Sequence, residues 1–276
     1  VLAPFGPMLP GLPEARYEAF ARAFASCGVD ANPTYRRSYG RLYEVFACKN
    51  SATEQKYREL YFSRPQDIVG RTVRLEVMDV DRHLKEFFSI TCGDVYQGNK
   101  AFDPNEVWGF FDYGPFKSLE EMKNSWVFNR KPNEAGFCII DNLTDRLIGA
   151  VYLVNDAPEN LSIQLEPPIV KPTAEASLQE IEACFLLMDR LFALGYRRIQ
   201  MAIDSQDSRR KKIPARLAFT QEGMILKHMI VKEANRDSNI YGVLNSDWEK
   251  GARDFMFKKI HGEKMQTLDN RNKPKD

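Results

Sequence analysis

A long amphipathic segment set between alternating segments restricts this chain to a mixed architecture of helices and strands. Residues 177–194 carry the strongest helical pattern in the chain, with an apolar stripe formed by Leu178, Ile181, Phe185, Met188 and Phe192. Before this stripe, Leu161, Ile163 and Leu165 recur at every second position, and after it residues 197–203 have the pattern of a strand. Strands that alternate with helices and include hairpins predict a mixed α/β domain of the α+β type.

The alternation of predicted strands and helices continues on both sides of this helix. Val73, Leu75 and Val77 alternate with polar residues, which predicts a strand with one solvent-facing side. Asp79 or Asp81 can cap a helix that follows, because a short carboxylate accepts hydrogen bonds from the first helical N–H groups. The remaining predicted elements are a hairpin of strands 137–141 and 147–154, a short helix at 209–217, and strands at 222–231 and 239–245.

Composition excludes several classes of function. The 39 Lys and Arg residues nearly balance the 38 Asp and Glu residues, which excludes a strongly basic nucleic-acid binder. No uninterrupted apolar run approaches the roughly 18–20 residues of a spanning helix, so we expect no membrane span. The five cysteines are scattered, which favours reduced thiols in an intracellular compartment, either the cytoplasm or an organelle. The first residue is Val1, not Met, which suggests a processed start and is compatible with the mitochondrion.

Two terminal segments lie outside the mixed pattern. Residues 1–68 begin with a Pro-rich stretch and continue with helical patterns, rich in Tyr and Phe, within residues 14–62. This helical extension either packs on its own domain or binds a protein partner. Residues 251–276 form a basic tail, a kind of segment that is usually solvated but can contact RNA phosphates or acidic protein surfaces. We therefore expect an extension, a domain at 69–250 and a tail.

The chain carries none of the common local motifs of catalysis. Its three histidines are far apart, and neither HExxH nor a Cys/His metal-ligand spacing occurs, so we expect no metal site. A GxSxG elbow, a Walker loop and a GxGxxG turn after a strand are also missing from the sequence. Cys92 and Cys138 could act as nucleophiles, but a lone cysteine is far more often a buried, inert thiol.

An ordered series of segments gives the sharpest signal. The segments read VGRTVRLEVMDV at 69–80, VWGFFDYGPF at 107–116, GFCIIDNLTDRLIGAVYLV at 136–154, ACFLLMDRLFALGYRRIQMAI at 183–203, RLAFTQEG at 216–223 and HMIVKEANRDSNIYGVLNSDW at 228–248. In this order and spacing the chain resembles the GCN5-related N-acetyltransferases (GNAT), and within them the RimJ/RimL-like branch. The resemblance covers about residues 69–249. It implies a bent mixed sheet, flanked by helices, whose central strands splay apart to hold acetyl-CoA.

The resemblance also implies roles for particular residues. The pyrophosphate of acetyl-CoA would rest at the start of the long helix 177–194, where backbone N–H groups and the helix dipole favour anions. The residues that match the family's cofactor positions are Lys171, Thr173, Ala174 and Ala176 along the pyrophosphate, and Asp207 and Arg210 along the pantetheine and adenosine. The candidate general base is Glu166, with Glu159 and Ser162 as alternatives, and Tyr241 is the second candidate catalytic residue.

The chain departs from the family at positions that are expected to bind the cofactor or to take part in catalysis. The loop at 169–176 has no glycine, Pro172 removes an N–H donor, and Glu175 places a carboxylate near the expected phosphates. Pro214 interrupts the short helix, and Gly242 replaces the serine of the family's Tyr-Ser pair. These departures favour a scaffold that has lost or weakened acetyl transfer and serves as a structural or interaction subunit of a larger assembly. The alternative is an active acetyl-CoA-dependent N-acetyltransferase that acts on a small amine or a protein N-terminus.

Overall fold

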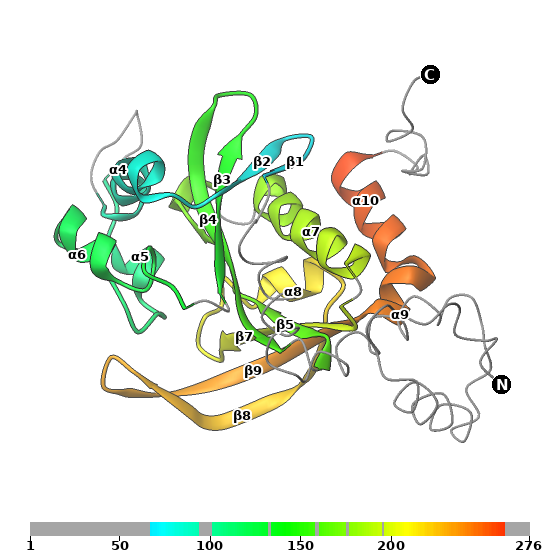
Figure 1. Cartoon of the computed structure of the whole chain (residues 1–276). Coiled ribbons are helices and arrows are strands. Elements are labelled where there is room, and N and C mark those ends of the chain that lie inside the picture. Colours follow the sequence, from blue (N-terminus) through cyan, green and yellow to red (C-terminus); the bar gives the residue numbers. More distant parts are fainter. Residues whose placement is uncertain are drawn as a thin grey trace, which may run out of the picture.

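The computed structural model of this chain describes residues 67–93, 101–131, 134–157, 160–174, 177–194 and 196–262 (Figure 1). The predicted helices within 14–62 and most of the predicted tail lie outside these residues, so the three-part division stays a prediction. Within the described residues, no helix is long and apolar enough to cross a membrane. The tail region begins with a helix, because Arg253–His261 is helical and its Met256 and Ile260 are buried.

One sheet of mixed direction forms the centre of the molecule. Its strands are β1 (Ile68–Val69), β2 (Val73–Val77), β3 (Ala135–Asp141), β4 (Arg146–Ala157), β5 (Ser162–Leu165), β6 (Ile169–Val170), β7 (Arg198–Asp204), β8 (Thr220–Val231) and β9 (Ala234–Leu244). They lie in the order β1-β2-β3-β4-β5-β7-β9-β8, and β6 pairs separately with β4. The strands predicted from alternation and the hairpin predicted around Asn142–Asp145 are confirmed within a few residues.

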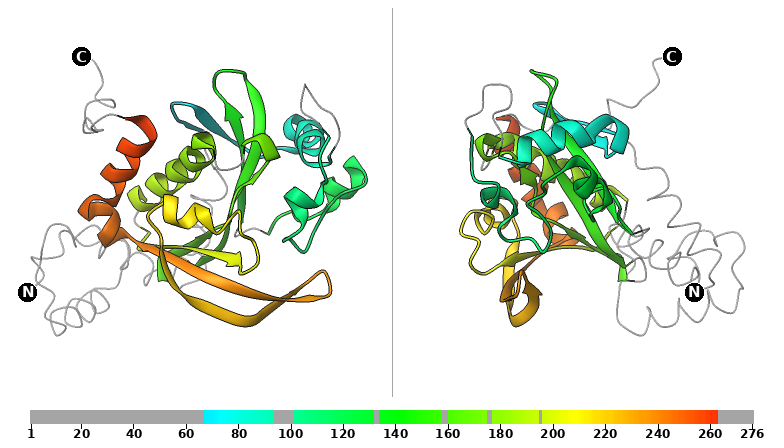
Figure 2. Two further views of the ribbon diagram at one scale, coloured as in Figure 1. Left: turned by 180° about the vertical axis from the view of Figure 1, so that it is seen from behind. Right: turned by 90° about the vertical axis from the view of Figure 1, so that its left-hand side faces the viewer.

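Helices cover both faces of this sheet (Figures 1 and 2). On one face lie α4 (Val80–Thr91), α5 (Asn105–Trp108) and α6 (Leu119–Asn124), over a core that includes Phe87, Trp108 and Tyr152. On the other face lie α7 (Leu178–Ala193), α8 (Lys212–Arg216) and α10 (Arg253–His261), over a larger core. The remaining described elements are the short turns η3 (Pro172–Ala174), α9 (Asn245–Asp247) and η4 (Trp248–Ala252).

Local chemistry explains where the helices begin. The side chain of Asp79 accepts a hydrogen bond from the Arg82 N–H and caps α4, which confirms one of its two predicted caps. The Ser177 side chain caps α7 in the same way through the Glu180 N–H. The helix α8 is shorter than predicted and starts at Lys212. Pro214 lies in its first turn, where an N–H would have no intrahelical acceptor, so this proline does not break the helix.

The sheet opens between two neighbouring parallel strands. β5 and β7 pair only over Ser162–Gln164 and Arg198–Gln200. Past this point the chain after β5 continues into β6, which pairs with β4, whereas β7 continues along β9 as far as Asp204. The two halves of the sheet therefore separate beyond Gln164 and Gln200. The splayed mixed sheet that the sequence predicts is confirmed.

Candidate functional site

The register of β7 directs peptide groups into the sheet opening. The Ser205 N–H donates to the Asp237 carbonyl at 2.8 Å, directly after the last paired residues of β7 and β9. Hydrogen-bonded and non-hydrogen-bonded pairs alternate along an antiparallel ladder, so Ala202 and Asp204 turn their N–H and C=O groups away from β9. Among the described residues no strand pairs with this side of β7 beyond Gln200. The Ala202 carbonyl accepts from Arg236 Nη2 at 3.3 Å, and the Asp204 carbonyl accepts from the Asp207 N–H at 3.1 Å. The N–H groups of Ala202 and Asp204 are therefore the groups that border the opening and suit a polar ligand.

Glu166 lies on the β5 side of the opening. Its N–H donates to the Tyr152 carbonyl at 2.9 Å, and its Oε1 accepts from Gln164 Nε2 at 2.5 Å. Burial raises the pKa of this carboxyl above its ordinary value, while the hydrogen bond from Gln164 and the nearby guanidinium of Arg236 oppose this shift. The carboxylates of Asp112 and Glu134 act in the same direction as burial. A carboxylate with a raised pKa is a better proton acceptor, which is the property that a general base needs.

The predicted catalytic pair lies on opposite faces of the sheet. Leu165 belongs to the core under α7, and successive residues of a strand point to opposite faces, so the Glu166 side chain lies on the face of α4 to α6. Tyr241, on β9, belongs to the core under α7. Burial raises the pKa of its phenol, which therefore stays protonated at neutral pH. The structure thus places the two residues on strands to either side of the opening without bringing their side chains to one face.

The loop before α7 uses its own hydrogen-bonding groups. The Lys171 N–H donates to the Ile148 carbonyl at 3.0 Å, and the Ala174 N–H donates to the Lys171 carbonyl at 2.8 Å. The Ala174 methyl group is buried in the core under α7, whereas Thr173 is exposed. Because the Ala174 N–H is already bonded, it cannot donate to a phosphate without breaking this turn. Ala176 and Glu175, and the alternative base Glu159, lie outside the described residues.

Asp207 and Arg210 form a buried ion pair. Asp207 Oδ2 accepts from Arg210 Nη1 at 2.8 Å, and Oδ1 accepts from the Arg210 N–H at 2.9 Å. Arg210 Nη2 also donates to the Val107 carbonyl at 2.8 Å, and its guanidinium lies 4.6 Å from the ring centroid of Phe111. Arg210 is therefore buried, at 9% exposed, although it belongs to a run of four cationic residues at 209–212, a pattern that is usually solvated. The pair ties the turn before α8 to the α5 region, and its predicted contact with a cofactor stays a prediction.

A cavity of about 230 Å³ lies between β6, the turn η3, the first turn of α7 and α8. It is lined by Pro168, Val170, Pro172, Glu180, Arg209, Arg210, Lys212, Ile213 and Arg216. Four cationic side chains and a single carboxylate give this cavity a positive balance, which suits a phosphate-bearing ligand. Of these cations, only Arg210 is assigned to the cofactor from the sequence. Arg209 and Lys212 belong to the basic run 209–212, for which a phosphate contact is the less favoured interpretation, and no sequence signal indicates Arg216.

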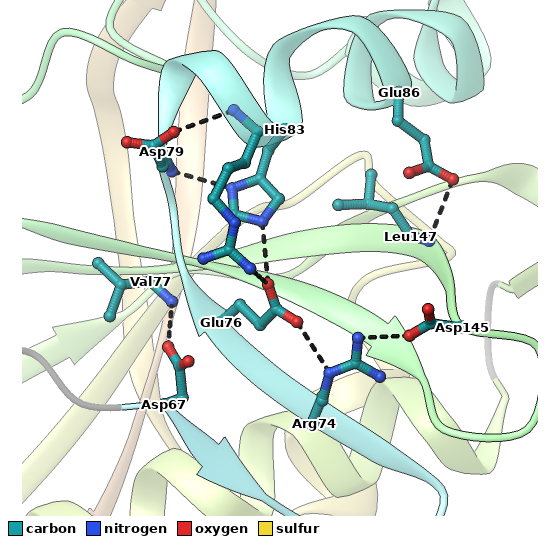
Figure 3. Close-up of polar contacts among 10 residues, drawn as sticks. Asp67, Arg74, Glu76, Val77, Asp79, His83, Glu86, Asp145 and Leu147 are labelled. Carbon is teal, nitrogen blue, oxygen red and sulfur yellow. Dashed lines mark hydrogen bonds and ion pairs between the residues drawn. The ribbon is translucent and has the colours of Figure 1, made fainter.

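A second polar cluster, on the face of α4, is structural (Figure 3). Glu76 on β2 accepts from Arg74 Nε at 2.8 Å and forms an ion pair with Arg82. The Asp79 N–H donates to His83 Nδ1 at 3.0 Å, so the proton of the neutral ring is on Nε2, which lies 3.3 Å from Glu76 Oε2. These contacts fix α4 on the sheet. Within the described residues no group of three or more His, Cys, Asp or Glu side chains could hold a metal ion.

Cys138 is not an activated thiol. It is fully buried on β3, and burial raises its pKa far above the ordinary value of a thiol, so it stays protonated. This environment agrees with the inert interpretation of the sequence and excludes Cys138 as the nucleophile at neutral pH.

Comparison with solved structures identifies the fold. A GCN5-related N-acetyltransferase from Brucella melitensis superposes with a TM-score of 0.64 and 24% sequence identity, over 74% of this chain and 89% of that protein. A GNAT-family protein from Chromobacterium violaceum ATCC 12472 gives 0.60 and 24%, over 66% and 88%. The ribosomal L7/L12 α-N-protein acetyltransferase RimL gives 0.53 and 16%, over 65% and 94%. Searches of family models and of curated protein sequences give no match. The chain has the GNAT fold, as its sequence predicts.

Proposed function

We propose that this chain is an acetyl-CoA-dependent N-acetyltransferase. The observation that carries the proposal is the sheet opening between β5 and β7, which has Glu166 on one side. A separate cation-lined cavity lies beside the first turn of α7. The N–H groups of Ala202 and Asp204 and the positive balance of the cavity both fit a long ligand with phosphate groups.

The residues present fit the predicted cofactor in part. Lys212 and Arg216 can contact phosphate oxygens in the cavity, and Lys171 and Thr173 lie in the adjoining loop. Because Ala174 has already used its N–H, the side-chain cations carry more of the phosphate binding here than in a glycine-rich loop. The charge of Arg210 is balanced by its buried pair with Asp207, so the positive balance of the cavity rests on the other cations. Acetyl-CoA, when bound, would supply the activated acetyl group.

Glu166 would accept the proton that the attacking amine loses. Its raised pKa makes it a stronger base than an ordinary glutamate. Tyr241 keeps its proton at neutral pH, but its side chain lies on the face of the sheet opposite to that of Glu166. Glu166 is therefore the principal catalytic candidate.

The acceptor would be a small amine or a protein N-terminus. The RimJ/RimL-like branch remains our interpretation of the sequence motifs, and one similar structure, RimL, is an α-N-protein acetyltransferase of ribosomal L7/L12. An intracellular, reducing compartment, cytoplasmic or organellar, accords with the buried free thiols of Cys138 and Cys184.

Calorimetric titration with acetyl-CoA, and then with CoA, tests the first half of this proposal. We expect a Kd in the micromolar range, about −8 kcal/mol, and a loss of about tenfold or more for Lys212→Glu. Lys227→Glu, at an exposed position of β8, is the control and should bind normally. No heat at millimolar ligand would overturn the proposal. A screen of amines then tests turnover, which Glu166→Gln should abolish.

A second candidate function is that of an interaction subunit without turnover. Two observations favour it: the Ala174 N–H is not available to a phosphate, and β8 exposes a row of large apolar side chains (Met224, Ile225, Leu226, Met229 and Ile230). In this case the helices predicted within 14–62 would bind a protein partner, and the basic tail could contact phosphate groups or RNA. Absence of acetyl-CoA binding in the titration above would favour this function.

A further inference from the structure

Three side-chain amides from three strands converge beside Glu166. Gln164, on β5, accepts at its Oε1 from Asn155 Nδ2 at 3.1 Å and from Gln200 Nε2 at 3.3 Å. Its own Nε2 donates to Glu166 Oε1 at 2.5 Å. Gln164 and Gln200 are also the last paired residues of β5 and β7 before the sheet opens. The amide network therefore lies at the apex of the opening.

The donors and acceptors of this network leave little orientational freedom. An ionised carboxylate can only accept hydrogen bonds, so the nitrogen of Gln164 must face Glu166. The oxygen of Gln164 then faces the two remaining amides, and both of them donate to it. Asn155 reaches this position from a β-bulge of β4, where its φ of 50° turns the chain out of register. Two other strands thus hold the Gln164 amide in place.

The two carboxylate oxygens of Glu166 also differ in their hydrogen bonds. Oε1 accepts from Gln164, whereas Oε2 accepts no hydrogen bond from any residue that the structure describes. A half-buried carboxylate with one oxygen held and the other open presents a single basic atom in a fixed direction. The open oxygen is the one that could receive a proton.

We propose that Gln164 is a positioning residue that fixes Glu166 so that Oε2 accepts the proton of the acceptor amine. The proposal rests on the N-acetyltransferase function proposed above. Gln200 extends the same network across the apex to β7, the strand whose peptide groups border the ligand side of the opening. A change in the spacing of β5 and β7 would therefore disturb the base as well as the ligand contacts.

Gln164→Met, which keeps the length of the side chain and removes the amide, tests the proposal in the full-length chain. We expect kcat to fall by roughly tenfold or more, with little change in KM for acetyl-CoA. The acid limb of the kcat profile should move to higher pH, because an ionised Glu166 loses a hydrogen bond that favours it. Asn124→Met is the matched control, since Asn124 Nδ2 also donates to a carboxylate, that of Glu120, at 3.0 Å on the exposed surface of α6. The control should leave kcat and its pH profile unchanged.

A titration of the Glu166 carboxyl by NMR separates this proposal from the proposed function. The resonance, assigned by its loss in Glu166→Gln, should titrate at higher pH in Gln164→Met than in the unmodified chain, whether or not an amine is acetylated. An unchanged Glu166 titration would overturn the positioning role. If Glu166 titrates as expected but no amine is acetylated, the proposed acetyltransferase function is wrong, and so is the positioning role that rests on it. The hydrogen bond from Gln164 to Glu166 is then only a structural contact. Normal kcat in Gln164→Met, with inactive Glu166→Gln, would also overturn the proposal.

Discussion

Glu182, on α7, accepts hydrogen bonds from the backbone N–H groups of both Thr72 and Arg71, at 2.9 and 2.6 Å. Its side chain is completely buried, and the Thr72 hydroxyl donates to it as well. A carboxylate of α7, 110 positions after Thr72, thus accepts from the N–H groups of the turn between β1 and β2. Through this carboxylate, the long helix holds the outer edge of the sheet.

We expect Glu182→Ala to destabilise the fold strongly. The substitution leaves two partly buried backbone N–H groups without their acceptor, and each such group costs up to about 1–3 kcal/mol. A loss of roughly 2–5 kcal/mol in the free energy of unfolding, measured with urea, is therefore expected. Glu249→Ala, at an exposed position, should change stability by less than about 0.5 kcal/mol. A loss below about 1 kcal/mol for Glu182→Ala would show that water replaces this contact.

Arg210→Met tests whether the buried pair with Asp207 is mainly a packing element. The variant leaves the Asp207 carboxylate buried without its counter-ion, so we expect a loss of about 3–5 kcal/mol in stability. Adding Asp207→Asn should recover part of this loss, because the unpaired charge is removed. Urea unfolding of the single and double variants gives the coupling between the two residues. Unchanged stability combined with weaker acetyl-CoA binding would show instead that Arg210 is a ligand contact.

Gly149→Ala should disturb the sheet next to the opening. A Cβ at this position would lie 2.5 Å from the Ile169 carbonyl oxygen and 2.7 Å from the Val170 Cα, so β6 would have to move away from β4. We expect a loss of about 1–3 kcal/mol in stability and weaker binding of acetyl-CoA, because β6 borders the cavity. Gly223→Ala, where nothing lies within 4 Å of the added atom, is the control. Equal thermal stability of the two variants would contradict the prediction.

The elements that follow hydrophobic periodicity could be predicted from the sequence. The stripe of α7, the hairpin of β3 and β4, and the alternation of β5 and β7 each repeat a local pattern that their burial then matches. The splay between β5 and β7 is a tertiary feature that no local pattern shows. It could be predicted because the order of the motifs identified the fold, and the fold includes the splay.

The polar contacts of the site could not be predicted in the same way. Arg210 belongs to a run of four cations, and nothing nearby in the sequence indicates the Val107 carbonyl, 103 positions earlier, that receives its guanidinium. Gln164 finds its partners on β4 and β7, and Glu182 finds Thr72 across 110 positions. Burial of a charged or amide side chain depends on such distant partners, so a local pattern assigns it to the surface.

Glu166→Gln should make the fold more stable at neutral pH. The pKa of Glu166 is raised in the folded chain, so the folded state holds this proton more tightly than the unfolded state does. Stability from this group is therefore fully present below the ordinary pKa of a glutamate and is lost as the pH rises through the folded value. Glutamine removes the titration, and thermal unfolding should show a gain for the variant at pH 7 to 8 that disappears in acid.

Glu222→Gln should behave in the opposite way and serves as the control for this measurement. Two hydrogen bonds from Arg198, at 2.7 and 2.5 Å, lower the pKa of the Glu222 carboxyl. Its stabilising contribution is present above the ordinary pKa of a glutamate and is lost as the pH falls through the folded value. The variant should therefore lose stability at neutral pH, by a small amount because the pair is partly exposed, and match the unmodified chain in acid. If both variants changed stability with the same sign across this range, Glu166 would not be a carboxyl with a raised pKa, and its selection as the base would be wrong.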